Sequence, residues 1–343
     1  MLFIRQNSMK LGNSLIQFED DDLVNKPGIF EDELFIALRK NYSERIEEIL
    51  ANVENFVTPT IINSYKKGIE RHLFPALVLS SDLGIPDLDT LNVSSAFIVG
   101  YSLPVLLLDQ LLDTKKSLDG FEEPFLDVIQ CIYNANHQLL KIGKSSVAYQ
   151  FNQHYLELTD SIRRENKLKF KIPENNIIDV YKYDILIHQA FYRSECHYFS
   201  AIVEGFLHLA GVNVSKMLQT YLRTFGLLRQ VTDEIADVEE DLSSGILTIP
   251  VLFAHSKSDM SELVKSYWKT EIDFRKVATI VTSLNGYVES YDLGHHIYSQ
   301  SRNLLASLIS EYKFLKNLSL FYDLRFAFLN RLKEDNWLDY KRG

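Results

Sequence analysis

Glycine and proline are scarce in this sequence of 343 residues, which contains 14 glycines and 8 prolines. Together they make about 6% of the chain, roughly half of their usual share of about 12%. Tight turns between short strands depend on these two residues, so their scarcity disfavours a β-sandwich or a barrel. Long helices are favoured instead.

Cysteine is almost absent as well. The only two cysteines, Cys131 and Cys196, have no paired spacing. This excludes a disulfide scaffold and a zinc site built from thiolates. We therefore expect the protein to work in a reducing cytoplasm.

Excess positive charge is also lacking, because 36 Lys and Arg residues face 46 Asp and Glu residues, a formal net charge of −10. This balance argues against nucleic acid as the main partner. The longest apolar run, residues 96–108, is interrupted by Ser102 and Pro104 and is too short to span a bilayer. The first residues hold no long apolar core and end in an acidic run, so we expect no signal peptide and no stable membrane insertion.

What the sequence does contain is a helical pattern, since apolar residues recur at spacings of three and four from Glu31 onward. This periodicity predicts an all-α fold. The breaks are short, and none looks like a linker between domains. We expect residues 31–343 to form a single helical domain and residues 1–30 to form an N-terminal extension that is partly disordered. The predicted helices span residues 60–83, 93–113, 123–142, 145–166, 178–211, 215–241, 247–256, 261–291, 294–314 and 317–333.

Two clusters of aspartates lie on predicted helices. Asp109 and Asp113 end an apolar helix and share one of its faces. Asp233, Asp237 and Asp241 follow one another at intervals of four, which predicts a stripe of three carboxylates. Like charges at this spacing repel, so the stripe needs either solvent or a cation. A solvated acidic face and a Mg²⁺ site at the rim of an apolar cavity both fit, and the apolar residues between the acids favour the second.

These clusters resemble the motifs of the trans-isoprenyl diphosphate synthase superfamily, the all-α class I fold that also contains terpene cyclases. The resemblance covers about residues 60–333. The best match is residues 230–250, QVTDEIADVEEDLSSGILTIP, which is similar to the second aspartate-rich motif and the D-L-x-x-G-K-x-T-x-P segment after it. DQLLD at residues 109–113 is similar to the first motif, DDxxD. Arg193-Ser194 stands at the family's Lys-Thr position, and His154 and Glu157 resemble part of its Gly-Gln-x-x-Asp-Leu segment.

The resemblance implies an isoprenoid synthase bundle of ten or more helices around a central apolar cavity, and a homodimer. It implies a prenyl diphosphate substrate and three Mg²⁺ ions held by five acids, of which the first four are also catalytic: Asp109, Asp113, Asp233, Asp237 and Asp241. The implied diphosphate-binding residues are Arg71, Lys115, Lys116 and Arg193. The implied substrate pocket is lined by Tyr101, Pro104, Val105, Leu108, Ser194, Tyr198 and Gln230.

The sequence departs from the family where the family binds isopentenyl diphosphate. Elongating members carry Gly-Gly-Lys-Arg-x-Arg-Pro, and in the alignment on Pro75 the last Arg is Phe74, the preceding Arg is His72, and Arg71 stands for the Lys. Ile246 replaces the lysine of the segment that follows the second motif. Charge-assisted hydrogen bonds to phosphate are lost at both places. The departures favour an enzyme that ionises one prenyl diphosphate without extending it.

We therefore expect a Mg²⁺-dependent terpene cyclase, with a prenyltransferase as the alternative and a non-catalytic helper subunit as a third hypothesis. The expected substrate is geranylgeranyl diphosphate. The small residues Pro104 and Val105 leave the pocket open, and Tyr101 lies eight residues before Asp109, about 12 Å deeper along a regular helix.

Overall fold

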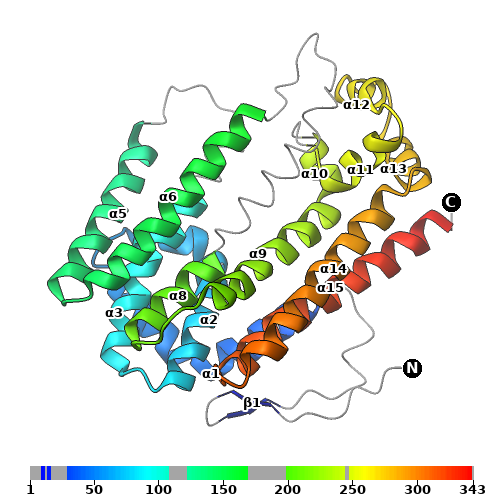
Figure 1. Cartoon of the computed structure of the whole chain (residues 1–343). Helices are drawn as coiled ribbons and strands as arrows, with labels where there is room; N and C mark the ends of the chain where they lie inside the picture. The colour runs from blue at the N-terminus through cyan, green and yellow to red at the C-terminus, as the bar shows by residue number, and fades with distance from the viewer. Residues whose placement is uncertain are drawn as a thin grey trace. The chain divides into compact units, whose positions relative to one another are not determined.

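The computed structural model of the chain describes residues 9–11, 14–16, 29–107, 122–168, 198–243 and 247–341. Within these ranges the elements are helices, except for a short antiparallel hairpin of β1 (Met9–Leu11) and β2 (Ser14–Ile16). The all-α prediction is confirmed. The helices are α1 (Ile29–Val53), α2 (Pro59–Leu83), α3 (Asp87–Phe97), η1 (Ile98–Ser102), α5 (Glu122–Lys141), α6 (Ser145–Leu168), α8 (Tyr198–Leu209), α9 (Lys216–Ala236), α10 (Val238–Ser243), α11 (Ile249–Lys257), α12 (Ser261–Trp268), α13 (Phe274–Ser283), α14 (Gly286–Leu308) and α15 (Leu315–Lys341) (Figure 1).

The chain divides into two compact units, and neither is continuous in sequence. Unit 1 comprises Met1–Leu156, Tyr198–Leu222 and Ser307–Leu320. Unit 2 comprises Glu157–His197, Arg223–Ala306 and Phe321–Gly343. The single domain expected over residues 31–343 was inferred from the absence of a linker. Each unit is assembled from separate stretches of the chain, so no one linker divides the two.

Unit 1 is built around α2 and the helix that leads toward the first aspartate cluster. Helix α2 packs against α8, α1 packs against α3, and η1 packs against α5. Gly100, in η1, allows this last approach, because a Cβ there would lie 2.5 Å from the Cβ of Ala135 in α5. The fully buried rings of Phe74, Phe97, Tyr101, Phe199 and Phe206 fill the interior of the unit.

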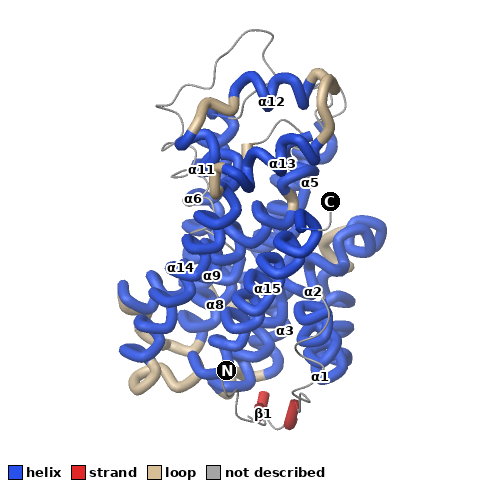
Figure 2. The backbone as a smooth tube through the Cα atoms, turned by 90° about the vertical axis from the view of Figure 1, so that its right-hand side faces the viewer, coloured by secondary structure: helices blue, strands red, loops and turns tan. Residues whose placement is uncertain are grey.

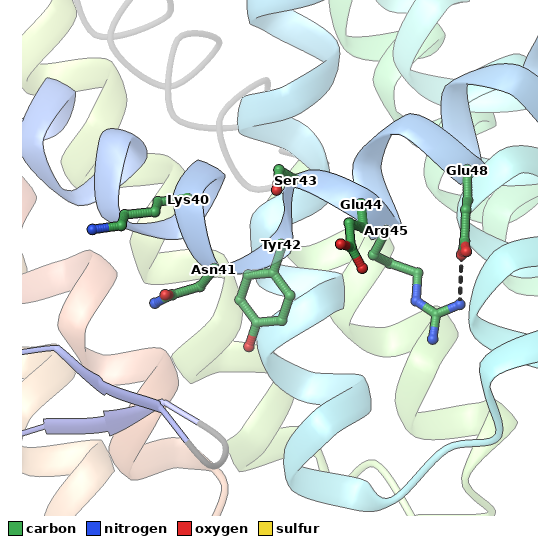
Figure 3. Close-up of a pocket in the computed structure, with 7 residues that line it drawn as sticks. All are labelled: Lys40, Asn41, Tyr42, Ser43, Glu44, Arg45 and Glu48. Carbon is green, nitrogen blue, oxygen red and sulfur yellow. Dashed lines mark hydrogen bonds and ion pairs between the residues drawn. The ribbon is translucent and has the colours of Figure 1, made fainter.

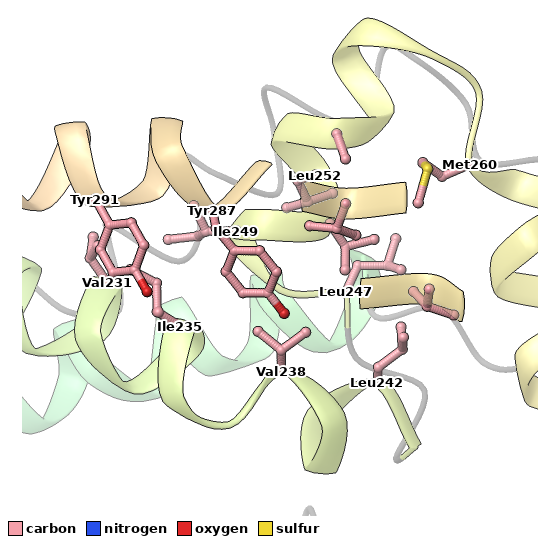
Figure 4. Packing of buried hydrophobic residues seen from close by; sticks show 14 of the residues in the cluster. Val231, Ile235, Val238, Leu242, Leu247, Ile249, Leu252, Met260, Tyr287 and Tyr291 are labelled. Atoms are coloured by element: carbon pink, nitrogen blue, oxygen red, sulfur yellow. The ribbon is translucent and has the colours of Figure 1, made fainter. Parts of the chain in front are cut away.

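Unit 2 has its own apolar core. Side chains of α9 and α10 meet those of α11 and α14, as Figure 4 shows for Ile235, Val238, Ile249 and Tyr287. Helices α11, α12 and α13 lie together in this unit, and α13 packs against both of the others (Figure 2). Gly286 begins α14 against α11, because a Cβ there would lie 2.2 Å from the carbonyl oxygen of Pro250.

The structure corrects two adjacent predicted helices, 261–291 and 294–314, because the predicted break between them lies inside α14 (Gly286–Leu308). Residues 261–291 form three helical segments and not one, because the backbone turns at Thr270 and Asn285, whose φ angles are 59° and 61°. Asp273 then caps α13 by accepting a hydrogen bond from the backbone N–H of Lys276 at 3.1 Å. Apolar periodicity continued through these turns, so it concealed both breaks.

A second difference concerns the helix that precedes the first aspartate cluster. Residues 98–102 form a π-helical turn between α3 and the helical residues 103–107. A π turn inserts an extra residue into the helical repeat and is frequent at functional sites. The expected depth of Tyr101 assumed a regular helix, and that assumption is wrong at its first residues.

Candidate active site

The second aspartate cluster lies in unit 2, at the end of α9 and the start of α10. Helix α9 stops at Ala236, but the backbone N–H groups of Asp237 and Asp241 still bond the carbonyls four residues earlier, both at 2.9 Å. The helical path is therefore nearly continuous. Buried Val231, Ile235 and Val238 alternate with the acids, so one face is fixed in the core and the other carries the carboxylates (Figure 4).

Asp233 is the best-held member of the cluster. One of its carboxylate oxygens forms an ion pair with the guanidinium of Arg325 from α15. The other accepts a hydrogen bond from Nε of Arg229, one turn earlier, at 3.1 Å. The Arg325 side chain is only 4% exposed, whereas that of Asp233 is 40% exposed. A buried guanidinium requires a nearby anion, and Asp233 supplies it.

Arg325 also bonds the backbone and side chain of α9. Its Nε donates to the Thr232 hydroxyl, and a terminal nitrogen donates to the Arg229 carbonyl at 3.3 Å. The guanidinium also lies over the Phe328 ring, 5.0 Å from its centroid. These contacts fix the last turns of α9 to α15.

Asp237 has a different environment. Asp237 is exposed, and its side chain makes no hydrogen bond or ion pair with the residues that the structure describes. Partial burial raises the pKa of this carboxyl group, and the negative charges of Asp233 and Glu240 raise it further, while Arg325 partly offsets them. A carboxylate surrounded by other carboxylates is the kind of group that a bound cation stabilises.

The residue beside Asp233 has a structural task. Glu234 is buried, and one of its oxygens accepts a hydrogen bond from Nε2 of Gln230 at 2.8 Å. Its other oxygen accepts from the backbone N–H of Ile249, the first residue of α11, at 2.7 Å. Thr248 immediately precedes α11 and Pro250 stands in its first turn. Gln230, predicted to line the substrate pocket, thus orients a neighbouring carboxylate.

Oxygen ligands on adjacent turns fit magnesium, which keeps several waters and binds one or two carboxylates together with substrate phosphates. Asp237 fits this role because it is exposed and unpaired among the described side chains. Asp233 is already neutralised by two arginines. Within the described residues no three acidic, histidine or cysteine side chains converge as a preformed metal cage would require.

The residues of the altered Gly-Gly-Lys-Arg-x-Arg-Pro motif lie in unit 1. Phe74 is 1% exposed and belongs to the core. His72 is also buried, its Nδ1 is 2.7 Å from the Ser102 hydroxyl, and its ring stacks on that of Tyr198 with centroids 3.9 Å apart. Arg71 is half-buried. Two of the three positions that carry cations in the family are therefore held inside the core of this unit.

The described residues of the predicted pocket floor also lie in unit 1. Pro104 is buried and Val105 is half-buried. Tyr101 is 1% exposed, stacks on Phe97 at 5.3 Å and meets the Tyr155 ring edge-on at 6.3 Å. Burial raises the pKa of Tyr155 to about 12, so its hydroxyl stays protonated at neutral pH. The wall around Tyr101 is thus aromatic and uncharged.

Comparison with solved structures identifies the architecture. The chain is similar to a decaprenyl diphosphate synthase from Rhodobacter capsulatus, with 14% identity, a TM-score of 0.67 and coverage of 87% of this chain and 99% of that one. A geranylgeranyl pyrophosphate synthase from Lactobacillus brevis matches with 17% identity, a TM-score of 0.65 and coverage of 86% and 97%. The fold is that of the prenyl diphosphate synthases.

A third structure with this fold carries ligands. The polyprenyl synthase from Caulobacter crescentus, crystallised with calcium and isoprenyl diphosphate, matches with 15% identity, a TM-score of 0.64 and coverage of 86% of this chain and 97% of that one. No family model matches the sequence, and no curated protein matches it. The likeness is therefore one of fold.

Several predicted site residues lie outside the residues that the structure describes. They are Leu108, Asp109, Asp113, Lys115, Lys116, Arg193 and Ser194. Their proposed roles as metal ligands, diphosphate contacts and pocket residues stay predictions, as does the role of Ile246. Of the remaining predicted residues, Gln230, Asp233, Asp237 and Asp241 are gathered in unit 2, whereas Arg71, Tyr101, Pro104, Val105 and Tyr198 are gathered in unit 1.

Sequence reasoning missed Arg325 and Glu234. Arg325 follows Asp233 by 92 residues, and nothing in its neighbourhood distinguishes it from an exposed helical arginine. Glu234 had a usable signal. It lies one position out of the Asp233–Asp237–Asp241 stripe, and therefore about 100° around the helix, among the buried residues.

Two other features of the described residues are not part of this site. A hollow of about 460 Å³ lies along α1, lined by charged and polar side chains that include Lys40, Glu44 and Arg45 (Figure 3). Such a lining does not suit a prenyl chain. Residues Asp87–Leu107 are long and apolar enough to cross a membrane, but 72% of their most apolar window is buried in the protein, as is usual for a core helix.

Proposed function

We propose that the protein is a prenyltransferase that ionises an allylic prenyl diphosphate and passes the prenyl group to an acceptor. The observation that carries the proposal is the α9–α10 carboxylate cluster in a prenyl diphosphate synthase fold. The three solved structures compared above are all described as prenyl or polyprenyl synthases, which favours transfer over the cyclase expected from the sequence.

In this proposal, Asp237 and Asp241 hold magnesium at the second cluster, and Asp109 and Asp113 hold it at the first. Bound magnesium supplies positive charge that stabilises the departing diphosphate. Arg325 and Arg229 hold the carboxylate of Asp233 in a fixed orientation. The described protein groups therefore position negative charge for the cation before the substrate arrives, so little reorganisation is needed during the reaction.

The prenyl chain is proposed to lie against the aromatic wall of unit 1 around Tyr101. Buried aromatic rings exclude water from a carbocation, and their faces attract positive charge. Geranylgeranyl diphosphate remains our expected substrate, because Pro104 and Val105 add no aromatic ring near this wall.

Cyclisation remains a second candidate because of one observation in unit 1. Phe74 is in the core, and His72 is engaged by Ser102 and Tyr198, so neither presents a cation to a second diphosphate. An enzyme without isopentenyl diphosphate in its site would use another acceptor or close the prenyl chain on itself.

We also propose a homodimer. Six of the ten large apolar side chains that are exposed among the described residues lie on α5 and α6. From residue 128 to 140 of α5, and from 147 to 156 of α6, no charged residue occurs. Exposed apolar faces without charge are typical of protein–protein contacts, and the lack of charge suits a second copy of the same face. This α5–α6 surface comprises Leu126, Ile129, Tyr133, Leu140, Tyr149 and Leu156.

The test of function is product analysis by mass spectrometry. Purified protein is incubated with Mg²⁺ and C10, C15 or C20 allylic diphosphates, with and without isopentenyl diphosphate. A longer diphosphate supports elongation. A hydrocarbon or alcohol formed without any acceptor supports the cyclase and contradicts prenyl transfer.

A further inference from the structure

The stretch of chain between Glu234 and Ile249, here called the loop, contains two of the proposed metal ligands, and the structure describes its residues 234–243 and 247–249. Its ends meet where the Glu234 carboxylate accepts the backbone N–H of Ile249 at 2.7 Å. Asp237 and Asp241 lie inside the loop, three and seven residues after Glu234. The cluster therefore lies in a stretch of chain whose two ends are joined by that hydrogen bond.

We infer that Glu234 is a positioning residue that holds Asp237 and Asp241 in place for the cation, an inference that rests on the proposed function. Glu234 itself is 8% exposed and both of its oxygens are occupied, so it faces the protein and not the cation. The negative charge of this carboxylate also stabilises the N-terminus of α11, where the first backbone N–H groups of a helix have no partner within the helix.

A second tie fixes the same loop independently. Trp268, the last residue of α12, donates its indole N–H to the backbone carbonyl of Leu242 at 2.7 Å. Val238 and Leu242 are buried in the core of unit 2 at 3% and 0% exposure. The residues flanking Asp241 are thus anchored by apolar contacts and one side-chain bond, while Glu234 supplies a hydrogen bond between the beginning of the loop and its end.

Loss of the Glu234 bond leaves the N–H of Ile249 unpaired in a buried place, because this residue is 0% exposed. The first turn of α11 is then expected to move toward water, and the loop opens with it. Asp237 and Asp241 would keep their charge and their helical backbone hydrogen bonds, but they would lose one of the contacts that fix this segment in place. Residues that orient metal ligands without touching the metal typically change metal affinity about 10- to 100-fold when they are removed.

The test compares Glu234→Ala with Glu234→Gln and with Glu239→Ala in the full-length chain. Glutamine keeps a carbonyl oxygen for the Ile249 N–H. Glu239 is exposed on α10, so Glu239→Ala removes the same charge from the same segment without touching the clasp between Glu234 and Ile249. Two properties are measured: amide hydrogen exchange of residues 249–257 in the metal-free protein, and affinity for magnesium pyrophosphate by titration calorimetry.

Glu234→Ala is expected to speed exchange in the first turn of α11 and to weaken magnesium pyrophosphate binding about 10- to 100-fold. Glu234→Gln should stay within a few-fold of the wild type in both exchange rate and affinity, and Glu239→Ala should match the wild type in both. Trp268→Phe, which removes the tie to Leu242, should weaken binding in the same direction and serves if Glu234→Ala does not fold.

Faster exchange with unchanged affinity in Glu234→Ala would overturn the inference and leave the proposed function standing. Unchanged exchange would overturn it as well, since the clasp would then not hold α11. If the wild-type protein fails to bind magnesium pyrophosphate, the proposed function itself is contradicted.

Discussion

Removing Asp233 should destabilise the protein more than removing Arg325, although the two form one ion pair. Asp233→Asn leaves a guanidinium that is 4% exposed without its anion. Breaking a buried pair in this way costs about 3–5 kcal/mol. Arg325 keeps its bonds to Thr232 and to the Arg229 carbonyl, so we expect the free energy of unfolding to fall by only about 2 kcal/mol.

Arg325→Met should destabilise the protein less, because the Asp233 carboxylate that it leaves behind is still solvated. The carboxylate is 40% exposed and still accepts from Arg229, so water and that arginine solvate it. Methionine also fills much of the vacated volume. We expect a cost of about 1 kcal/mol. The double variant should cost no more than Asp233→Asn alone, because no unpaired buried charge remains in it.

Differential scanning calorimetry without metal measures these differences. For a unit of about 150–250 residues, 1 kcal/mol corresponds to a shift of about 2–4 °C in Tm. We therefore expect decreases of about 4–8 °C for Asp233→Asn and about 2–4 °C for Arg325→Met. Glu262→Gln, which breaks the exposed 3.0 Å pair with Lys265, is the control and should change Tm by about 1 °C or less. A larger loss for Arg325→Met than for Asp233→Asn would refute the reasoning.

Three further predictions concern the site and the surface. Asp237→Asn should raise Tm of the metal-free protein at pH 7, because burial and nearby carboxylates raise the pKa of Asp237 above its usual 3.8; the gain should vanish as pH falls through the raised pKa, where the wild-type carboxyl is also neutral. An equal gain at pH 3 and pH 7 would contradict this origin. Val105→Phe should shift kcat/KM toward farnesyl diphosphate at least several-fold with little change in Mg²⁺ dependence, and an unchanged preference would place the prenyl chain elsewhere. Tyr133→Glu together with Leu126→Glu should convert the dimer to a monomer in sedimentation experiments, and a dimer that persists would assign the interface to another surface.

The helices of this fold are predictable because their apolar residues recur at spacings of three and four. The scarcity of glycine and proline and the spacing of three and four gave most elements, including α2 within one residue of its start. Periodicity failed at Thr270, Asn285 and η1. In the first two places a positive φ interrupts the helix. In the third, a π turn keeps the run of apolar residues that is typical of a buried helix, but it shifts which residues share a face.

The candidate site could be located from sequence only in part. The spacing of Asp233, Asp237 and Asp241 placed three acids on one path, and the structure keeps them there. Their different surroundings depend on contacts that spacing does not encode. Arg325 comes from a helix far along the chain, and Glu234 meets a backbone N–H fifteen residues later.

The central claim is that the acids of α9 and α10 hold the cation that activates a prenyl diphosphate. Its most direct test is the Mg²⁺-dependent release of pyrophosphate from geranylgeranyl diphosphate, with and without isopentenyl diphosphate as the acceptor, by the wild type and by Asp237→Asn, with Glu239→Gln as the matched control. We predict that Asp237→Asn lowers kcat/KM at least about 10²-fold, the scale of losing one preorganised electrostatic group, while Glu239→Gln retains wild-type activity. Wild-type turnover in Asp237→Asn, or turnover that persists in excess chelator, would contradict the account.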